Sequence, residues 1–175
     1  MENDKLYIVL TQTYSILAKT IKLITKDTYS HASLSFDKKC NEMYSFGRKY
    51  RYFPFYGIFK KENLKEGLFK NKGSLIAIYE INVTENQFDE AKKRVGQIKN
   101  NNKGYNIIGL LLAKFRIKLN RSKYYCSEFV YDVLSYKDVN LINDKDVRFK
   151  PEELIKGLNG KKIFEGEIRE FINTI

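Results

Sequence analysis

In the middle of the chain, a sequence pattern typical of a strand is followed directly by one typical of a helix start. These two adjacent patterns constrain the fold most. The segment SLIAIYEINV (74–83) is short, apolar and rich in β-branched residues, which predicts a strand buried on at least one face. Thr84 and Gln87 then have the spacing of a capping box at the start of a predicted helix, TENQFDEAKKRVGQIK (84–99). A strand followed at once by a helix favours a domain that mixes the two.

Two short segments earlier in the chain predict an antiparallel hairpin. YSHASLSF (29–36) alternates small polar and apolar residues, which is typical of a half-buried strand. His31, Ser33 and Ser35 then share one face of that strand, and the apolar residues share the other. DKKCN provides a turn, and EMYSFG (42–47) returns as a second strand.

The remaining segments extend this mixture of strands and helices. Strands are predicted at 6–11 and in one or two short pieces at 161–171, helices at 14–26, 105–115, 125–136 and 151–158, and a long loop or irregular extended segment at 48–61. In chain order this gives β-α-β-β-β-α-α-α-α-β, without an internal repeat. The sequence therefore predicts a single α+β domain over residues 1–175.

The charge balance favours anionic partners. The chain has 32 Lys and Arg residues against 21 Asp and Glu, a net charge of +11. Such an excess suits nucleic acid, lipid headgroups or an acidic polymer, although basic residues spread along the whole chain also fit a general surface bias. Because no recognised nucleic-acid-binding motif is present, we do not expect nucleic acid to be the partner.

Neither a membrane span nor an export signal is predicted. No stretch approaches the roughly 18 apolar residues that a transmembrane helix needs, and the apolar run within residues 1–15 is too short and interrupted for a signal peptide. Cys40 and Cys126 are the only cysteines, and nothing supports pairing them. Free thiols suit a reducing compartment, so we expect a cytoplasmic protein.

Cys126 is the first candidate for chemistry. It opens the predicted helix in KYYCSEFVYDV (123–133), just after the cations Arg121 and Lys123. A helix N-terminus and nearby cations both lower the pKa of a thiol and favour the nucleophilic thiolate. Backbone N–H groups at the helix start would also stabilise an oxyanion on an attacked carbonyl. The alternative is that Cys126 fills a core as a small hydrophobic side chain.

His31 is the only histidine, so it is the one imidazole that could serve Cys126 as a general base. Its small neighbours Ser33 and Ser35 leave space for a cleft, although an ordinary strand histidine has similar neighbours. Serine is a poor nucleophile candidate here, because both serines share the strand of the histidine. One histidine and two separated cysteines do not predict a metal site, and no cofactor is expected.

The segments YSHASLSFD and YYCSEFVYDVL, in this order, resemble the permuted NlpC-like branch of the papain-like cysteine enzymes, the YaeF/YiiX type. In that family a histidine-bearing strand precedes the cysteine-bearing helix, and here His31 precedes Cys126 by 95 residues. The resemblance covers residues 6 to about 136. It implies a permuted papain-like domain with an antiparallel sheet packed on helices, a nucleophile at Cys126 and a general base at His31.

The resemblance also implies a polar residue that orients the imidazole from the strand after the histidine strand. Aligning EMYSFG with that strand places Ser45 there, with Glu42 as the fallback. Serine departs from the family's pattern, because a neutral hydroxyl cannot stabilise an imidazolium by charge. Tyr124 and Tyr125 would line the cleft or assist the oxyanion site, or else pack in the core, and Ser33 is a further cleft candidate.

Together with the pairing of Cys126 and His31, the resemblance implies a cysteine-dependent hydrolase of the amidase or peptidase type that acts on an amide or ester carbonyl through a thioacyl-enzyme. A lipid acyl hydrolase or acyltransferase at the same site, or a non-catalytic module for an anionic ligand, remains as an alternative. The segment RKYRYFPFYGIFKK (48–61) interleaves five cations with aromatic residues and would suit an anionic surface, unless its aromatics fold back on the core. Expected substrates are small molecules, peptides or lipids.

Overall fold

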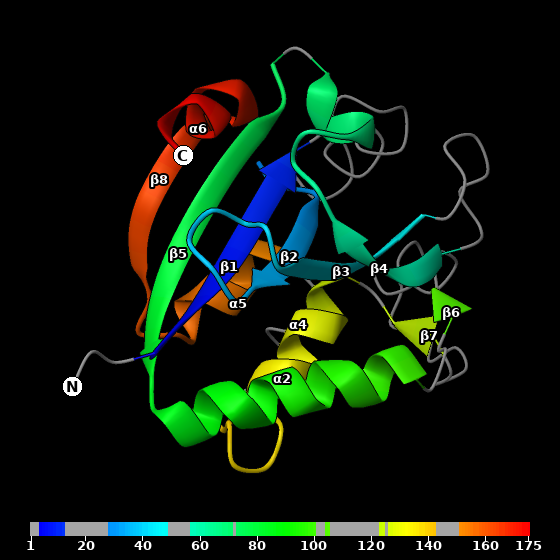
Figure 1. Ribbon diagram of the computed structural model, residues 1–175, viewed down its shortest axis with the longest axis vertical. Coiled ribbons are helices and arrows are strands. Elements are labelled where there is room, and N and C mark those ends of the chain that lie inside the picture. The colour runs from blue at the N-terminus through cyan, green and yellow to red at the C-terminus, as the bar shows by residue number, and fades with distance from the viewer. Residues whose placement is uncertain are drawn as a thin grey trace.

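The computed structural model describes residues 4–12, 28–48, 57–71, 73–100, 104–105, 123–124, 126–142 and 151–175 (Figure 1). Within them lies a six-stranded sheet with the order β4-β3-β2-β1-β5-β8, in which all neighbours are antiparallel. The strands are β1 (Asp4–Gln12), β2 (His31–Ser35), β3 (Met43–Arg48), β4 (Gly57–Glu62), β5 (Leu75–Val83) and β8 (Lys161–Glu167). A separate parallel pair is formed by β6 (Gly104–Tyr105) and β7 (Lys123–Tyr124).

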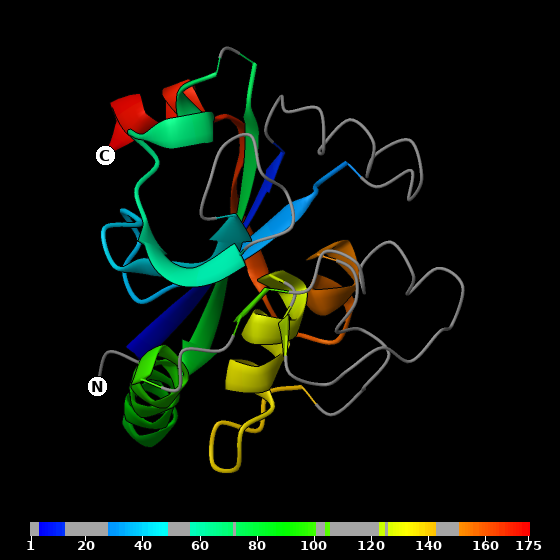
Figure 2. The same cartoon turned by 90° about the vertical axis from the view of Figure 1, so that its right-hand side faces the viewer.

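Helices cover both faces of the sheet, as Figures 1 and 2 show. Those that the described residues form are α2 (Glu85–Asn100), α4 (Cys126–Leu134), α5 (Pro151–Lys156), α6 (Ile168–Thr174) and the short 3-10 helix η1 (Gly67–Lys70). One face packs on α2, α4 and α5, and the other packs on α6 and η1. None of these helices is long and apolar enough to cross a membrane.

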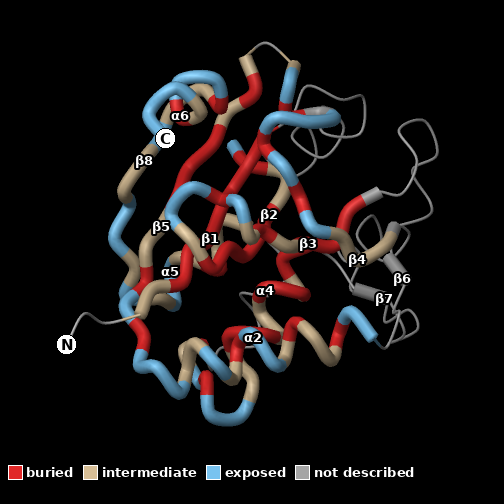
Figure 3. The backbone as a smooth tube through the Cα atoms, viewed as in Figure 1, coloured by how far each residue is buried: buried red, intermediate tan, exposed pale blue. Residues whose placement is uncertain are grey.

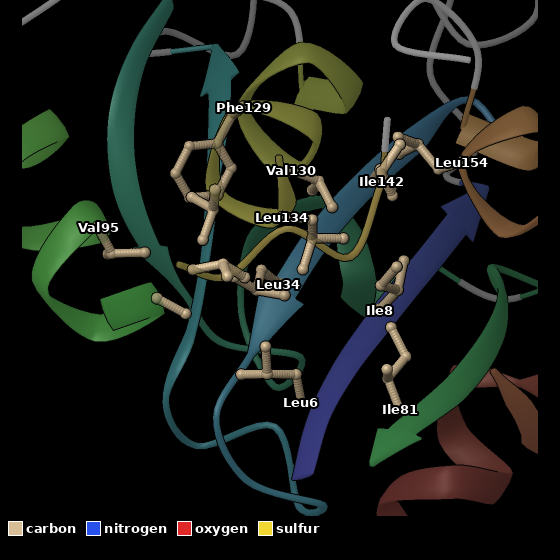
Figure 4. Packing of buried hydrophobic residues seen from close by; sticks show 14 of the residues in the cluster. Leu6, Ile8, Leu34, Ile81, Val95, Phe129, Val130, Leu134, Ile142 and Leu154 are labelled. Carbon is tan, nitrogen blue, oxygen red and sulfur yellow. The ribbon is translucent and has the colours of Figure 1, made fainter. Parts of the chain in front are cut away.

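Alternation along the strands divides the core into two clusters. In β1, Leu6, Ile8 and Leu10 face the larger cluster, whereas Tyr7 and Val9 face the smaller one. Buried residues are concentrated in β1, β2 and parts of β5 and α4, while α2 carries both buried and exposed residues (Figure 3). Members of the larger cluster that pack between the sheet and α4 include Leu6, Ile8, Leu34, Phe129, Val130 and Leu134 (Figure 4).

Several predicted elements are confirmed. The hairpin forms as β2 and β3, and β5 is followed directly by α2. The capping box closes as predicted, because the Thr84 amide donates to Gln87 Oε1 at 3.0 Å and the Gln87 amide donates to Thr84 Oγ1 at 3.2 Å. The predicted helices at 14–26 and 105–115 lie outside the described residues, apart from Tyr105 in β6.

Two predicted elements were wrong in part. The segment 48–61 is not a loop throughout, because Gly57–Glu62 forms β4 and pairs with β3. Its Phe59 ring stacks on Tyr44 at 5.6 Å and meets Phe129 edge-on at 5.7 Å, so burial of aromatic surface favours the strand. The segment 161–171 contains one strand and then the start of α6. Ile168 and Phe171 lie on the same face of this helix, and both are buried.

Candidate active site

Cys126 is the first residue of α4, and its placement follows from how that helix packs. Phe129, Val130, Val133 and Leu134 anchor the helix in the larger core cluster, and the helix packs against β2 and β3. This packing leaves the cysteine at the N-terminal end of α4, only 7% exposed. The thiol forms no disulfide, and the backbone N–H groups of Ala32 and Ser127 favour its thiolate form.

His31 lies on the face of β2 that also carries Ser33 and Ser35. It is the first residue of β2, paired with Thr11 of β1, and its side chain is 19% exposed. From the side of the larger cluster, the start of α4 brings the Cys126 thiol into hydrogen-bond contact with the imidazole. The structure therefore joins the only histidine to the cysteine that the sequence paired with it.

Glu62, the last residue of β4, holds the other side of the imidazole. Its carboxylate oxygens Oε1 and Oε2 lie 3.2 Å and 3.1 Å from His31 Nε2. Since Nε2 faces the carboxylate, Nδ1 is the nitrogen left for Cys126. Glu62 pairs with Met43, which belongs to the smaller cluster, so the carboxylate reaches the histidine from the opposite face of the sheet to α4.

The carboxylate of Glu62 is itself held firmly. Its side chain is 1% exposed, and a buried carboxylate needs partners for its oxygens. Ser33 Oγ donates to Oε2 at 2.5 Å, and Lys60 Nζ lies 3.1 Å from Oε1. With His31, these contacts fix the position of the carboxylate and hence the orientation of the imidazole ring.

The electrostatics of the site favour an imidazolium paired with a thiolate. Burial opposes the charging of His31, but the negative charges of Glu62 and Cys126 outweigh it and raise the pKa of the imidazole to about 10. Burial likewise disfavours the Cys126 thiolate, yet the His31 charge and the backbone N–H donors lower the pKa of the thiol. The same imidazolium, with Lys60 and Ser33, holds the pKa of Glu62 well below its usual range despite burial.

Cys40 provides the contrast. It is buried on the smaller cluster, and burial together with the charge of Asp37 raises the pKa of its thiol to about 12. The two cysteines are thus chemically distinct, because only Cys126 has an imidazolium beside it.

The predicted orienting residues are not the ones in contact with His31. Ser45 is fully buried, and its hydroxyl has no hydrogen-bond partner, so it does not orient the ring. Glu42 is not the substitute either, because its carboxylate accepts from Tyr44 and pairs with Lys92 at 3.5 Å. Glu62 contacts the imidazole instead, because its longer side chain brings a full negative charge to the ring from β4, the strand beside β3.

Of the other predicted site residues, Ser33 has a different contact from the one predicted, and the tyrosine side chains lie outside what the structure describes. Ser33 is fully buried and supports Glu62, rather than lining an open cleft. Tyr124 belongs to β7, but its side chain, like Tyr125 and Arg121, lies outside what the structure describes. Glu128 is in the first turn of α4, where a negative charge suits the helix dipole.

Lys60 was missed because it falls in the segment 48–61 that was predicted as a loop, and Glu62 was missed because it directly follows that segment. The sequence did contain a strand signal. In GIFKKE (57–62), a strand would place Ile58, Lys60 and Glu62 on one face and Phe59 on the other. Treating this segment as a third hairpin strand would have put a carboxylate near the histidine.

A cavity of about 420 Å³ opens next to the end of β4. Three lysines give it positive charge, and two asparagines and several apolar side chains complete it. The lining residues are Lys39, Cys40, Asn41, Lys61, Glu62, Asn63, Leu64, Lys65, Ile172 and Ile175. In the part of the chain that the structure describes, no cluster of three or more His, Cys, Asp or Glu side chains is arranged to hold a metal ion.

No protein-family model, curated protein or solved structure matches the chain. The contacts among Cys126, His31 and Glu62 therefore provide the basis for a functional argument.

Proposed function

We propose that the protein is a cysteine hydrolase of the amidase or peptidase type, which cleaves an amide or ester bond through a thioacyl-enzyme. Cys126 is the nucleophile, His31 transfers the proton and Glu62 orients the imidazole. The single observation behind this proposal is the buried series of contacts from Glu62 through His31 to Cys126. A thiol, an imidazole and a carboxylate in this order are the groups that acyl transfer to cysteine requires.

The first half-reaction forms the thioacyl-enzyme. The Cys126 thiolate attacks the carbonyl carbon, so that a carbon–sulfur bond forms and the carbonyl π electrons move to oxygen. Backbone N–H groups at the start of α4, together with its dipole, stabilise this oxyanion. When the tetrahedral intermediate collapses, the bond to the leaving group breaks, and the His31 imidazolium gives its proton to the departing amine or alcohol.

The second half-reaction restores the enzyme. Neutral His31 accepts a proton from water as the oxygen attacks the thioester carbonyl, and the thiolate leaves as the acid forms. One water is consumed, and the resting imidazolium–thiolate pair is regenerated without any change of oxidation state. Glu62 stays ionised throughout and stabilises the imidazolium each time it forms.

We also propose a permuted papain-like architecture for the domain. Support comes from the order of the two elements, since the histidine strand β2 precedes the cysteine helix α4 and the two pack together. The antiparallel sheet with helices on its faces is compatible with this class. The sequence resemblance adds the same order of motifs.

An anionic acyl substrate, such as a lipid with an acidic headgroup, is a second candidate, and the cavity beside β4 favours it. Lys39, Lys61 and Lys65 are among its lining residues and provide cationic groups, while Leu64 and Ile172 provide apolar surface. Such a lining suits a molecule with a negative group and a hydrocarbon portion. A non-catalytic module for the same ligand would use the cavity but leave Cys126 unreactive.

The proposal is tested by intact-mass spectrometry after exposure to separate pools of peptides, small acyl esters and phospholipids. We expect an acyl mass increment on Cys126, with the reactive pool identifying the substrate class. C126A should abolish the increment, whereas C40A, which removes the other thiol, should keep it. An increment that survives in C126A, or that moves to Cys40, would contradict the assignment of the nucleophile.

A further inference from the structure

Three side chains share the carboxylate of Glu62, and the chemistry above uses only one of them. His31 Nε2 faces both carboxylate oxygens, while Ser33 supplies a neutral donor to Oε2. Lys60 places a second positive charge 3.1 Å from Oε1. Two cations therefore compete for one carboxylate whose side chain is only 1% exposed. A neutral hydrogen-bond donor would have been enough to satisfy Oε1, so hydrogen bonding alone does not explain why a charged lysine lies there.

The neighbouring strand makes room for this lysine. Lys60 pairs with Ser45 of β3, and its side chain then crosses Gly47 on the same strand. A Cβ atom added to Gly47 would lie 2.6 Å from Lys60 Cε, which is far inside van der Waals contact. The absence of a side chain at position 47 therefore lets the lysine stem lie against β3 and bring its ammonium group to Glu62.

We propose that Lys60 is a positioning residue, which shares the Glu62 carboxylate with His31 and thereby limits how tightly that carboxylate holds the imidazolium. This inference rests on the proposed function, because it concerns the proton that His31 must release. A general acid that holds its proton too strongly is inefficient near neutral pH. Lys60 keeps Glu62 ionised and fixed in place, while its own positive charge makes the neighbouring imidazolium easier to deprotonate.

The distances set the size of this effect. Oε1 lies 3.1 Å from Lys60 Nζ and 3.2 Å from His31 Nε2, so the two cationic nitrogens are at most about 6.3 Å apart. Among the described residues, the titratable groups that face His31 are Glu62 from β4 and Cys126 from α4, with Lys60 behind the carboxylate. Because the Lys60 side chain is 38% exposed, solvent screens the repulsion, and we expect a shift of about one pKa unit.

The test is an NMR titration of the imidazole in a C126S background, where no thiol titrates alongside it. His31 is the only histidine, so its Cε1–H signal needs no assignment. Lys60→Met should raise the pKa of His31 by about one unit, since the repulsion is lost. Lys60→Arg should restore the original value, because it returns the charge. Lys61→Met, which neutralises the adjacent exposed lysine, should leave the value unchanged.

A second variant disturbs the lysine without changing its charge. Gly47→Ala should push the Lys60 side chain away from Glu62 and raise the pKa of His31 in the same direction by a smaller amount. A purely structural lysine would lower the melting temperature of Lys60→Met and leave the titration of His31 where it was, and that result would overturn the proposal. A Cys126 that proved unreactive towards substrates would not alter this titration, so failure of the proposed function can be told apart.

Discussion

Replacing Glu62 with glutamine should weaken the hold on the imidazolium proton. The pKa of His31 is raised from its ordinary value of 6.5 to about 10 by the negative charges of Glu62 and Cys126, against the opposing effect of burial. The total rise of about 3.5 units corresponds to about 5 kcal/mol at about 1.4 kcal/mol per unit. Because Glu62 is the larger of the two charge contributions, we expect E62Q to lower the pKa of His31 by about two units.

Two assays check this prediction. NMR titration of the single histidine measures the pKa directly, and the alkaline limb of ester hydrolysis should move to lower pH by the same interval, because it reports loss of the imidazolium proton. E66Q is the matched control, since Glu66 is an exposed carboxylate four residues further along the chain. If E62Q left the pKa of His31 unchanged, or raised it, the assignment of Glu62 as the charge partner would be refuted.

Three further predictions concern the charges of the site and of the neighbouring cavity. H31A should raise the pKa of Cys126, because the imidazolium charge is lost and only the backbone N–H donors still oppose burial, and alkylation by iodoacetamide at pH 7 should slow by at least about tenfold. His31 stabilises the fold below pH 6.5 and loses this contribution as the pH rises towards 10, whereas Cys126 gains its contribution as the pH rises towards 9.0. These slopes oppose each other in the wild type. In C126S the His31 slope stands alone, and chemical denaturation above pH 6.5 should show the free energy of unfolding falling by up to about 1.4 kcal/mol per pH unit. Reversing the charge of both Lys61 and Lys65 should abolish cosedimentation with vesicles that contain an acidic phospholipid, if the cavity binds the headgroup; unchanged cosedimentation would exclude that role.

The contact between His31 and Cys126 could be predicted from the sequence because the chain has a single histidine. One histidine and one cysteine at a helix start left a single pairing to consider, and the structure brings His31 and Cys126 into contact. The third residue could not be predicted in the same way. Ser45 was chosen from its place on the strand after the histidine strand, but contact across a sheet also depends on side-chain length and strand twist. Glu62, one strand further away, reaches the imidazole where a serine does not.

In the fold, too, some features that depend on neighbouring residues were predicted, whereas those that depend on contacts between distant segments were not. The capping box at Thr84 and Gln87 is a local feature, and it forms as the spacing predicted. By contrast, the alternation in GIFKKE fits a strand, but this local pattern does not reveal that the strand pairs with β3 or that Phe59 packs against Tyr44. The start of α6 was missed because Glu167 occupies the N-cap, where Ser, Thr, Asp or Asn would have marked a helix.

The most direct test of the central claim is a pre-steady-state burst with an activated aryl ester, followed by peptide mass mapping. If Cys126 is a nucleophile activated by His31, the wild type should release about one equivalent of phenol per chain in the burst and carry the acyl group on Cys126. C126A should show no burst, and H31A should acylate far more slowly. Acylation of Cys126 at the same rate in H31A and the wild type would contradict the account, because the thiol would then react without help from the imidazole.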